Sequence, residues 1–192
     1  MNPPNAERPR QSGQPGARRG SNLRVAFGHE PELISACLEG LEASAPERAR
    51  QILKAAQAAL SDFPDYADLH YHASRAALAA GEYETATRLL ESALRVNPGY
   101  VDALLLAARV ALQGHRLADA RRHLETARDR GADYPDLHML MGGVCCKEGN
   151  WQAARAEYER ALELNANLAE ARAALAALRP APRSGTDDEL PA

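Results

Sequence analysis

An internal repeat of 34 residues is the feature that most constrains the fold of this chain. Three segments align without a gap, at 67–100, 101–134 and 135–168. Alanine stands at the twentieth and twenty-seventh positions of every segment, as Ala86, Ala120, Ala154 and as Ala93, Ala127, Ala161. Self-similarity at a fixed period of this length predicts a row of stacked supersecondary units. We expect the paired alanines to lie where helices cross most closely, so that a larger residue there overpacks the core.

Each segment reads as two antiparallel helices. In the first segment, the apolar periodicity predicts one helix over about 67–80, which Gly81 ends, and a second over about 84–96. Asn97-Pro98-Gly99 then ends the second helix. One such hairpin cannot bury its own apolar face, whereas stacked neighbours can.

Further positions of the repeat point to a known family. Gly81-Glu82-Tyr83 and Gly149-Asn150-Trp151 precede the second half of two segments, and Pro98 closes the first. With the paired alanines, these residues resemble the tetratricopeptide repeat (TPR) family, whose pattern is W-x₂-L-G-x₂-Y…A-x₃-F…P. The resemblance covers about 67–178 and implies an all-α, right-handed α-solenoid of helix-turn-helix repeats.

The first half of each segment matches that family less closely. The fourth position, often tryptophan in the family, holds His70, Leu104 and His138. Gly142 alone supplies the family's close-packing glycine at the eighth position, and Gly143 after it leaves the surface more open. Proline is absent where Ala132 and Ala166 stand.

The segments that flank the three repeats predict caps and tails. Residues 29–66 read as a divergent first repeat or an N-terminal helical cap, and 169–180 as a C-terminal capping helix with Glu170 and Arg172 facing outward. Residues 1–28 are rich in Pro, Gly and Arg, and 181–192 are acidic. Both tails are expected to be disordered, because they offer little apolar surface to offset their ordering entropy.

Composition supports closely packed helices and excludes several other classes. The chain holds 40 Ala against 25 Leu, with 5% aromatic residues, which disfavours a β-sandwich or a doubly wound sheet. A net charge of −3 gives no general attraction to nucleic acid or anionic lipid. No apolar run is long enough to span a membrane. Arg18-Arg19 is followed by too short an apolar run for an export signal, and the three cysteines form no disulfide framework, so we expect a cytoplasmic protein.

The chain carries no recognisable catalytic or metal-binding motif. It lacks G-x-x-x-x-G-K, G-x-G-x-x-G, H-E-x-x-H and a C-x-x-C pair, so we expect no enzyme activity, no cofactor and no metal. His70 and His138 occupy the same repeat position two units apart and cannot share a metal ion. We interpret both histidines, and Cys146 beside Lys147, as packing residues.

The resemblance implies a binding surface on the first helix of each repeat. In the family, the second, fifth, ninth, twelfth and thirteenth positions point into the concave groove. In this chain they are Asp68, Tyr71, Arg75, Leu78 and Ala79, then Asp102, Leu105, Arg109, Leu112 and Gln113, then Asp136, Met139, Gly143, Cys146 and Lys147.

Two rows within this groove suggest a ligand. Tyr71, Leu105 and Met139 form an apolar row beside Arg75 and Arg109, an arrangement that suits an extended or helical peptide with an acidic group. In the alternative interpretation, the arginines pair with Asp68, Asp102 or Asp136 and the groove is neutral. The positions that clamp a chaperone C-terminus in part of the family hold Tyr71, Arg75, Leu106, Asp136 and Leu140, none of which matches, so that ligand is not expected.

The sequence therefore predicts a non-catalytic interaction module, an adaptor or scaffold that binds a peptide or helix of a partner protein. Two alternatives stay open: a self-assembling oligomeric scaffold, and a regulatory subunit of an enzyme complex. A membrane partner is not expected. Nucleic acid is not favoured either, although the basic N-terminal tail keeps a tether to it as a further hypothesis.

Overall fold

The computed structural model describes residues 46–178, and within that range all regular structure is helical. The helices are α3 (Pro46–Asp62), α4 (Ala67–Ala79), α5 (Tyr83–Val96), α6 (Val101–Gln113), α7 (Leu117–Asp129), α8 (Pro135–Lys147), α9 (Trp151–Leu164) and α10 (Ala169–Ala177). The predicted all-α solenoid is confirmed. The expectations for 1–28, for 29–45 and for 179–192 lie outside the described residues.

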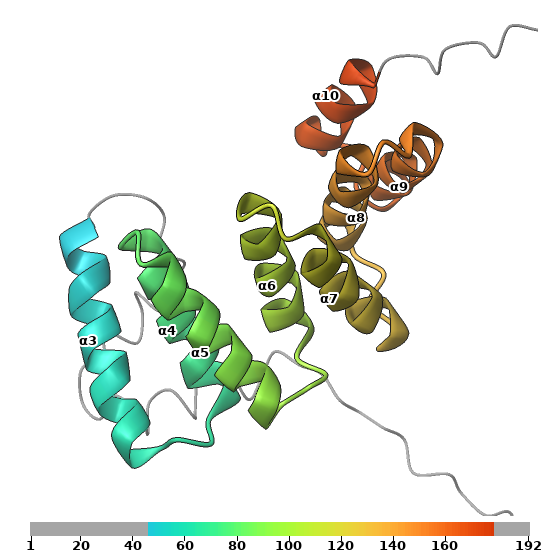
Figure 1. Cartoon of the computed structure of the whole chain (residues 1–192). Coiled ribbons are helices and arrows are strands. Elements are labelled where there is room, and N and C mark those ends of the chain that lie inside the picture. Colours follow the sequence, from blue (N-terminus) through green and yellow to red (C-terminus); the bar gives the residue numbers. More distant parts are fainter. Residues whose placement is uncertain (1–45, 179–192) are drawn as a thin grey trace, which may run out of the picture.

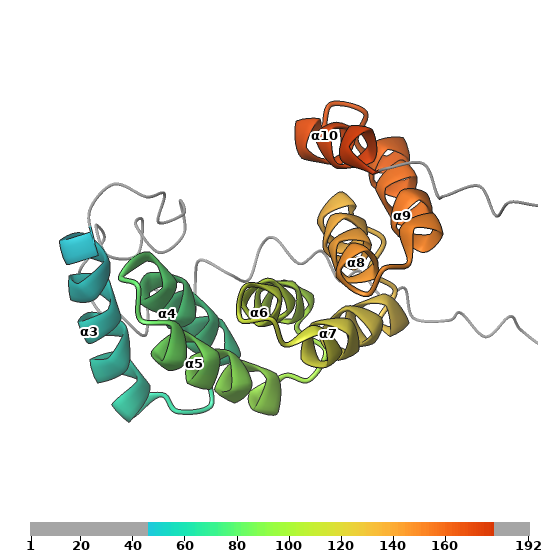
Figure 2. The ribbon, with the colours of Figure 1, turned by 45° about the horizontal axis from the view of Figure 1, so that its top comes forward.

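The helices follow one another along a curved path from α3 to α10 (Figure 1). Three antiparallel pairs make up most of this path: α4 with α5, α6 with α7, and α8 with α9. The same order is visible after rotation in Figure 2, where α3 covers one end of the row and α10 the other. Each of the three 34-residue segments thus contributes one helix pair.

The paired alanines lie at the centre of each helix pair, as predicted. All six have a relative exposure of 0%: Ala86, Ala93, Ala120, Ala127, Ala154 and Ala161. Because alanine is the smallest residue that keeps a high helix propensity, it lets two helix backbones approach closely without a loss of helicity.

A second pair of positions balances size across each helix pair. The twenty-fourth position holds the buried residues Leu90, Leu124 and Tyr158. The eighth position opposite Tyr158 is Gly142, where a Cβ would lie only 2.4 Å from the ring atom Cε1 of Tyr158. Gly142 is therefore the close-packing glycine that the sequence predicts, and it makes room for the larger aromatic residue of the third repeat.

The turn inside each pair depends on one residue in the left-handed region. Gly81 and Gly149 have φ values of 81° and 78°, and His115 has φ 57° at the equivalent place in the second repeat. In the first turn, the Glu82 amide donates to the Ala77 carbonyl oxygen at 2.8 Å, which closes the end of α4. Gly81 ends the helix as predicted.

The two outer helices pack by their apolar faces. On α3, Ile52, Leu53 and Ala56 are buried against the first repeat. Ile52 lies 34 residues before Ala86 and thus takes the place of the repeat's alanine in this core. On α10, Ala171 and the following Leu178 are buried, while Glu170 and Arg172 are exposed. The outward placement of these two charged residues agrees with the prediction.

Candidate functional site

The fifteen groove positions lie on α4, α6 and α8, the first helices of the three pairs. None of them is buried: each retains at least intermediate exposure, and Arg109, Gln113, Asp136 and Lys147 are exposed. Their accessibility contrasts with Leu69, Ala103 and Leu137, the third positions of the same helices, which have 0% exposure. The first helices therefore present one accessible face.

Aromatic rings form part of this face where the first repeat meets the second. The ring centroid of Tyr71 lies 5.2 Å from that of Tyr100, the residue that precedes α6. The guanidinium carbon of Arg75 lies 5.9 Å from the Tyr71 centroid, within range of a cation–π contact. Tyr71 thus connects α4 to the residue that caps the start of α6, and its ring supports Arg75.

Neither groove arginine is neutralised by a carboxylate within residues 46–178. No ion pair within 4.0 Å joins Arg75 or Arg109 to an acidic side chain there, whereas several other arginines of the chain have such partners. The pairing of these arginines with Asp68, Asp102 or Asp136, which the alternative interpretation requires, does not occur among the described residues.

The third repeat has a different residue at the ninth of the predicted groove positions. At the ninth position Gly143 replaces arginine, and a Cβ there would meet only Leu112 Cδ1, at 4.0 Å. The backbone of α8 accordingly approaches α6 as well as α7. The arginine row is therefore limited to α4 and α6, and the apolar surface of Leu112 and Met139 continues beyond it.

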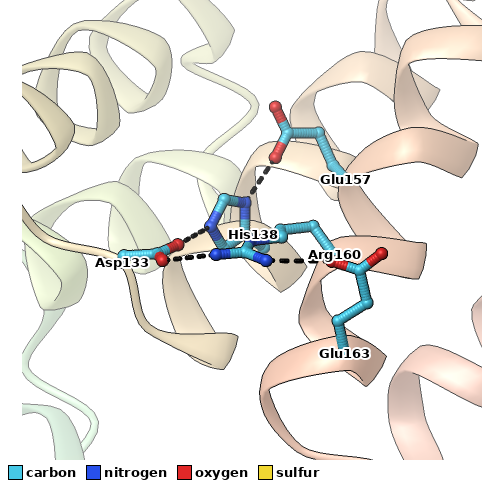
Figure 3. Close-up of polar contacts among 5 residues, drawn as sticks. All are labelled: Asp133, His138, Glu157, Arg160 and Glu163. Carbon is cyan, nitrogen blue, oxygen red and sulfur yellow. Dashed lines mark hydrogen bonds and ion pairs between the residues drawn. The ribbon is translucent and has the colours of Figure 1, made fainter.

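The histidines that share the fourth position have structural partners. The Nε2 atom of His70 lies 2.8 Å from the Pro64 carbonyl oxygen. Figure 3 shows His138 between two carboxylates, with Nδ1 2.7 Å from Glu157 Oε2 and Nε2 2.8 Å from Asp133 Oδ1. No group of three histidine, cysteine or acidic side chains in the described part of the chain is arranged to hold a metal ion.

A charged network surrounds His138. Arg160 on α9 donates to Asp133 Oδ2 at 2.6 Å and to Glu163 Oε2 at 2.9 Å (Figure 3). The pKa of the Asp133 carboxyl is lowered, mainly by the hydrogen bond from Arg160 and to a smaller extent by the one from His138. These contacts fasten the loop before α8 to α9, so the network is structural.

The two neighbouring cysteines of α8 are free thiols. Cys145 is buried, and Cys146 Sγ lies 3.5 Å from the hydroxyl oxygen of Tyr158. Burial raises the pKa of that tyrosine. Both cysteines pack against α9, which agrees with the interpretation of Cys146 as a packing residue.

Sequence reasoning missed one feature, a cavity where the first and second repeats meet. We call this boundary the first junction, and the boundary between the second and third repeats the second junction. The cavity has a volume of about 800 Å³ and lies between the start of α5 and the end of α6. It shares only Gln113 with the groove positions. One sequence signal could have indicated the cavity. Two repeat positions hold Thr87 and Gly114 at the first junction but Arg121 and Glu148 at the second.

A family model described as tetratricopeptide repeat matches residues 77–144. That match runs from the end of α4 through most of α8 and includes the whole second repeat. No curated protein matches the chain in sequence.

Solved structures with a similar fold include three chains, two of which are described as TPR proteins. The protein pilF of Pseudomonas aeruginosa has 19% identity and a TM-score of 0.68, with 82% of this chain and 69% of that chain covered. YrrB, a TPR protein with an unusual peptide-binding site, has 24% identity and a TM-score of 0.59, with 64% and 63% covered. TTC0263, a thermophilic TPR protein in Thermus thermophilus, has 23% identity and a TM-score of 0.58, with 68% and 72% covered. At these identities the likeness establishes the fold.

The fold and the comparisons agree on a stack of helical repeats with an accessible face. None of the helices within residues 46–178 combines the length and apolar character needed to cross a bilayer. Within residues 46–178, the cavity at the first junction and the accessible face of the first helices are two surfaces that a ligand could reach.

Proposed function

Since this chain is a tetratricopeptide repeat protein, we propose that it is a non-catalytic module that binds a peptide or helix of a partner protein in its concave groove. A TPR fold implies a role in protein–protein interaction or as a scaffold. The finer assignment to the groove is specific to this chain and rests on the residues of α4 and α6. The partner is sought in the cytoplasm, the compartment expected from the sequence.

The observation that carries the proposal is a pair of arginines for which residues 46–178 provide no carboxylate partner. Arg75 and Arg109 stand at the same position of adjacent repeats, and neither forms an ion pair within residues 46–178. Guanidinium groups that keep their donors available are suited to bind a carboxylate in a two-point geometry. An acidic group on the partner would satisfy them.

The apolar row beside the arginines supplies the second part of the site. Tyr71, Leu105 and Met139 all retain intermediate exposure on the same face. Accessible apolar side chains next to cationic ones match the demands of an amphipathic segment, whose apolar side is buried and whose acidic side is neutralised. YrrB, with its peptide-binding site, offers an analogy of fold for such a use.

The test is affinity capture from the native lysate with the wild-type chain and with the variant Arg75→Glu/Arg109→Glu. The matched control is Arg95→Glu/Arg128→Glu, which makes the same change of charge on exposed residues near the ends of α5 and α7. Far-UV circular dichroism and mass in solution are checked first for all three proteins.

We expect a partner that the wild type and the control retain and the groove variant loses. The segment of the captured partner that binds is then identified and made as a peptide. Calorimetry compares the affinity of this peptide for the three proteins. Equal capture by the groove variant and the wild type would contradict the proposal. It would direct attention to self-association, the alternative that the sequence left open.

A further inference from the structure

The two junctions between repeats differ at one pair of facing positions. At the second junction, Arg121 on α7 reaches Glu148 at the end of α8. Its Nε donates to Glu148 Oε1 at 3.0 Å and its Nη2 donates to Glu148 Oε2, so that the guanidinium and the carboxylate meet at two points. Arg121 Nη2 also lies 3.8 Å from Cys145 Sγ. The long side chain of Arg121 thus spans the space between the second and third repeats.

The same positions at the first junction hold Thr87 and Gly114, one repeat earlier. Neither side chain is long enough to span the space, and no ion pair replaces the missing one within the described residues. The cavity of about 800 Å³ lies at this place and is lined by both residues, together with Tyr83, Arg88, Val110 and Arg116. Two small residues thus line the cavity at the first junction, whereas the long side chains of Arg121 and Glu148 occupy the equivalent positions at the second.

The floor of the cavity is apolar and continues inward. Val110, which is 6% exposed, lines it and also lines a smaller cavity of about 80 Å³ that shares Thr87 and Arg116. The smaller cavity has an apolar side of Leu90, Leu94 and Ala107, and it is also lined by the polar residues Glu91, Asp119, Arg122 and His123. At the rim, Tyr83 exposes 57% of its surface although it is a large aromatic residue. An apolar side chain of a ligand could therefore make van der Waals contacts with Tyr83 at the rim and with Val110 on the floor.

The charges at the rim favour an acidic ligand. Arg88 has no ion pair among the described residues, and Arg116 reaches Asp119 only at 3.9 Å. Glu84 is the one carboxylate among the residues that line the larger cavity. At the rim of the larger cavity the guanidinium groups of Arg88 and Arg116 stand against the carboxylate of Glu84, whereas the carboxylates of Glu91 and Asp119 line the smaller cavity, so the positive excess is confined to the rim.

We propose that the cavity at the first junction is a second binding site, and that it takes a short segment of a protein partner in which a large apolar side chain is flanked by carboxylates. The apolar side chain occupies the space that Arg121 fills at the second junction. The flanking carboxylates bind Arg88 and Arg116. A volume of about 800 Å³ is within the size range of ligand-binding pockets, and this one opens to the surface between its exposed rim residues.

The site is separate from the groove on which the proposed function rests. The groove follows the exposed face of the first helices, whereas the cavity lies between the start of α5 and the turn after α6. Each site can therefore fail without the other.

The test moves the residues of the second junction into the first. The variant Thr87→Arg/Gly114→Glu leaves the net charge unchanged, and a Cβ at position 114 would have no neighbour closer than 3.5 Å. The probe is a fluorescein-labelled pentapeptide, Glu-Asp-Phe-Asp-Glu, titrated into the full chain and followed by fluorescence anisotropy. Control peptides replace its phenylalanine with alanine or its acidic residues with lysine.

We expect the wild type to bind the probe and to bind both control peptides at least about tenfold more weakly. The Thr87→Arg/Gly114→Glu variant should lose at least about tenfold in affinity for the probe. If that variant does not fold, Tyr83→Ala/Arg88→Gln at the exposed rim replaces it, with the same expected loss. Amide resonances of residues 83–88 and 113–116 should shift on titration of the wild type.

Three results would overturn the proposal: undetectable binding to the wild type, equal affinity for the variant with the filled cavity, or resonance shifts confined to residues 71–79 and 105–109. The last result would place the probe in the groove. It would count against the second site and leave the proposed function standing.

Discussion

The first and second junctions connect repeats of the same length and are built in different ways. At the second junction the backbone of α8 lies close to both α6 and α7, and the Arg121–Glu148 pair spans the remaining space. At the first junction α6 makes its close backbone approaches to α5 rather than α4, and Tyr71 reaches Tyr100 with a side-chain contact. Thr87 and Gly114 line the cavity at the opposite end of α6.

The comparison shows that the packing inside each repeat and the contacts between neighbouring repeats are determined by different residues. The buried alanines are the same in all three repeats, so each helix pair forms in the same way. What changes from one junction to the next is the residue that faces its neighbour repeat. In a solenoid the stability depends on each repeat and on each nearest-neighbour interface separately, so one junction can be open without unfolding the others.

The largest effect is expected for Gly142→Ala, beside the second junction. The new Cβ would lie 2.4 Å from one atom of the buried Tyr158 ring, so the ring or the two helices must shift. We expect a loss of about 2 kcal/mol in the free energy of unfolding, measured by denaturation with urea.

The neighbouring substitution Gly143→Ala is the matched control, since the nearest side-chain atom to its Cβ is 4.0 Å away. It should stabilise the chain by about 0.5–1 kcal/mol through helix propensity. Tyr158→Leu added to Gly142→Ala reproduces the pairing of Ala108 with Leu124 and should recover most of the loss. A Gly142→Ala variant as stable as the wild type would show that the size match does not hold the third repeat together.

A smaller effect is expected when the second junction is converted into the first. Arg121→Thr/Glu148→Gly removes an ion pair whose side chains are 34% and 32% exposed. Because the pair is partly screened by water, its loss should lower the free energy of unfolding by about 1 kcal/mol. Urea denaturation gives this number, and a crystal structure of the variant should show a new cavity at α7 and α8. An unchanged stability with a closed surface would mean that the pair does not distinguish the junctions.

The pH dependence of that difference sharpens the comparison. The hydrogen bond from Arg121 lowers the pKa of the Glu148 carboxyl, so the folded state favours its ionised form. The stabilisation is complete above the ordinary glutamate pKa of about 4.3 and is lost as the pH falls through the lower folded value. Stability curves of the wild type and of Arg121→Thr/Glu148→Gly should therefore converge in acid. Parallel curves down to the acid limit would contradict the assignment.

The smallest effect is expected at the turn of the second repeat, which adjoins the first junction. His115 adopts φ 57°, where Gly81 and Gly149 stand in the other repeats. His115→Gly should stabilise the chain by about 0.5 kcal/mol, because glycine reaches this region without a steric cost. Thermal denaturation would show a rise of a few degrees at most. A decrease would mean that the imidazole makes a contact worth more than the backbone strain.

The parts of the fold that repeat with the period were predictable from the sequence. Ala86, Ala120 and Ala154 could be placed at helix crossings, because identical spacing implies identical packing. The helix limits followed from local signals such as Gly81, and the charged exterior of α10 followed from Glu170 and Arg172. The accessibility of the groove positions was expected from the family register, whereas their use by a partner stays a prediction.

The contacts between repeats could not be predicted in the same way. Arg121 and Glu148 are separated by 27 residues, and nothing in the sequence says that these two positions face each other across a junction. The equivalent positions of the first junction hold Thr87 and Gly114. That difference predicts a structural change only once the Arg121–Glu148 contact is known. The cavity became visible only when the two junctions were compared by repeat position. The placement of Arg75 on the ring of Tyr71 likewise depends on rotamers that spacing does not determine.

Native-state hydrogen exchange, measured residue by residue at low urea concentrations, tests most directly whether the first junction is open and the second is closed by Arg121 and Glu148. We predict that amides around the first junction, at 83–88 and 113–116, open with a lower free energy than those at 117–122 and 147–150. In Thr87→Arg/Gly114→Glu the protection of the first junction should rise to that of the second. Equal protection at both junctions of the wild type, or lower protection at the second, would contradict the account.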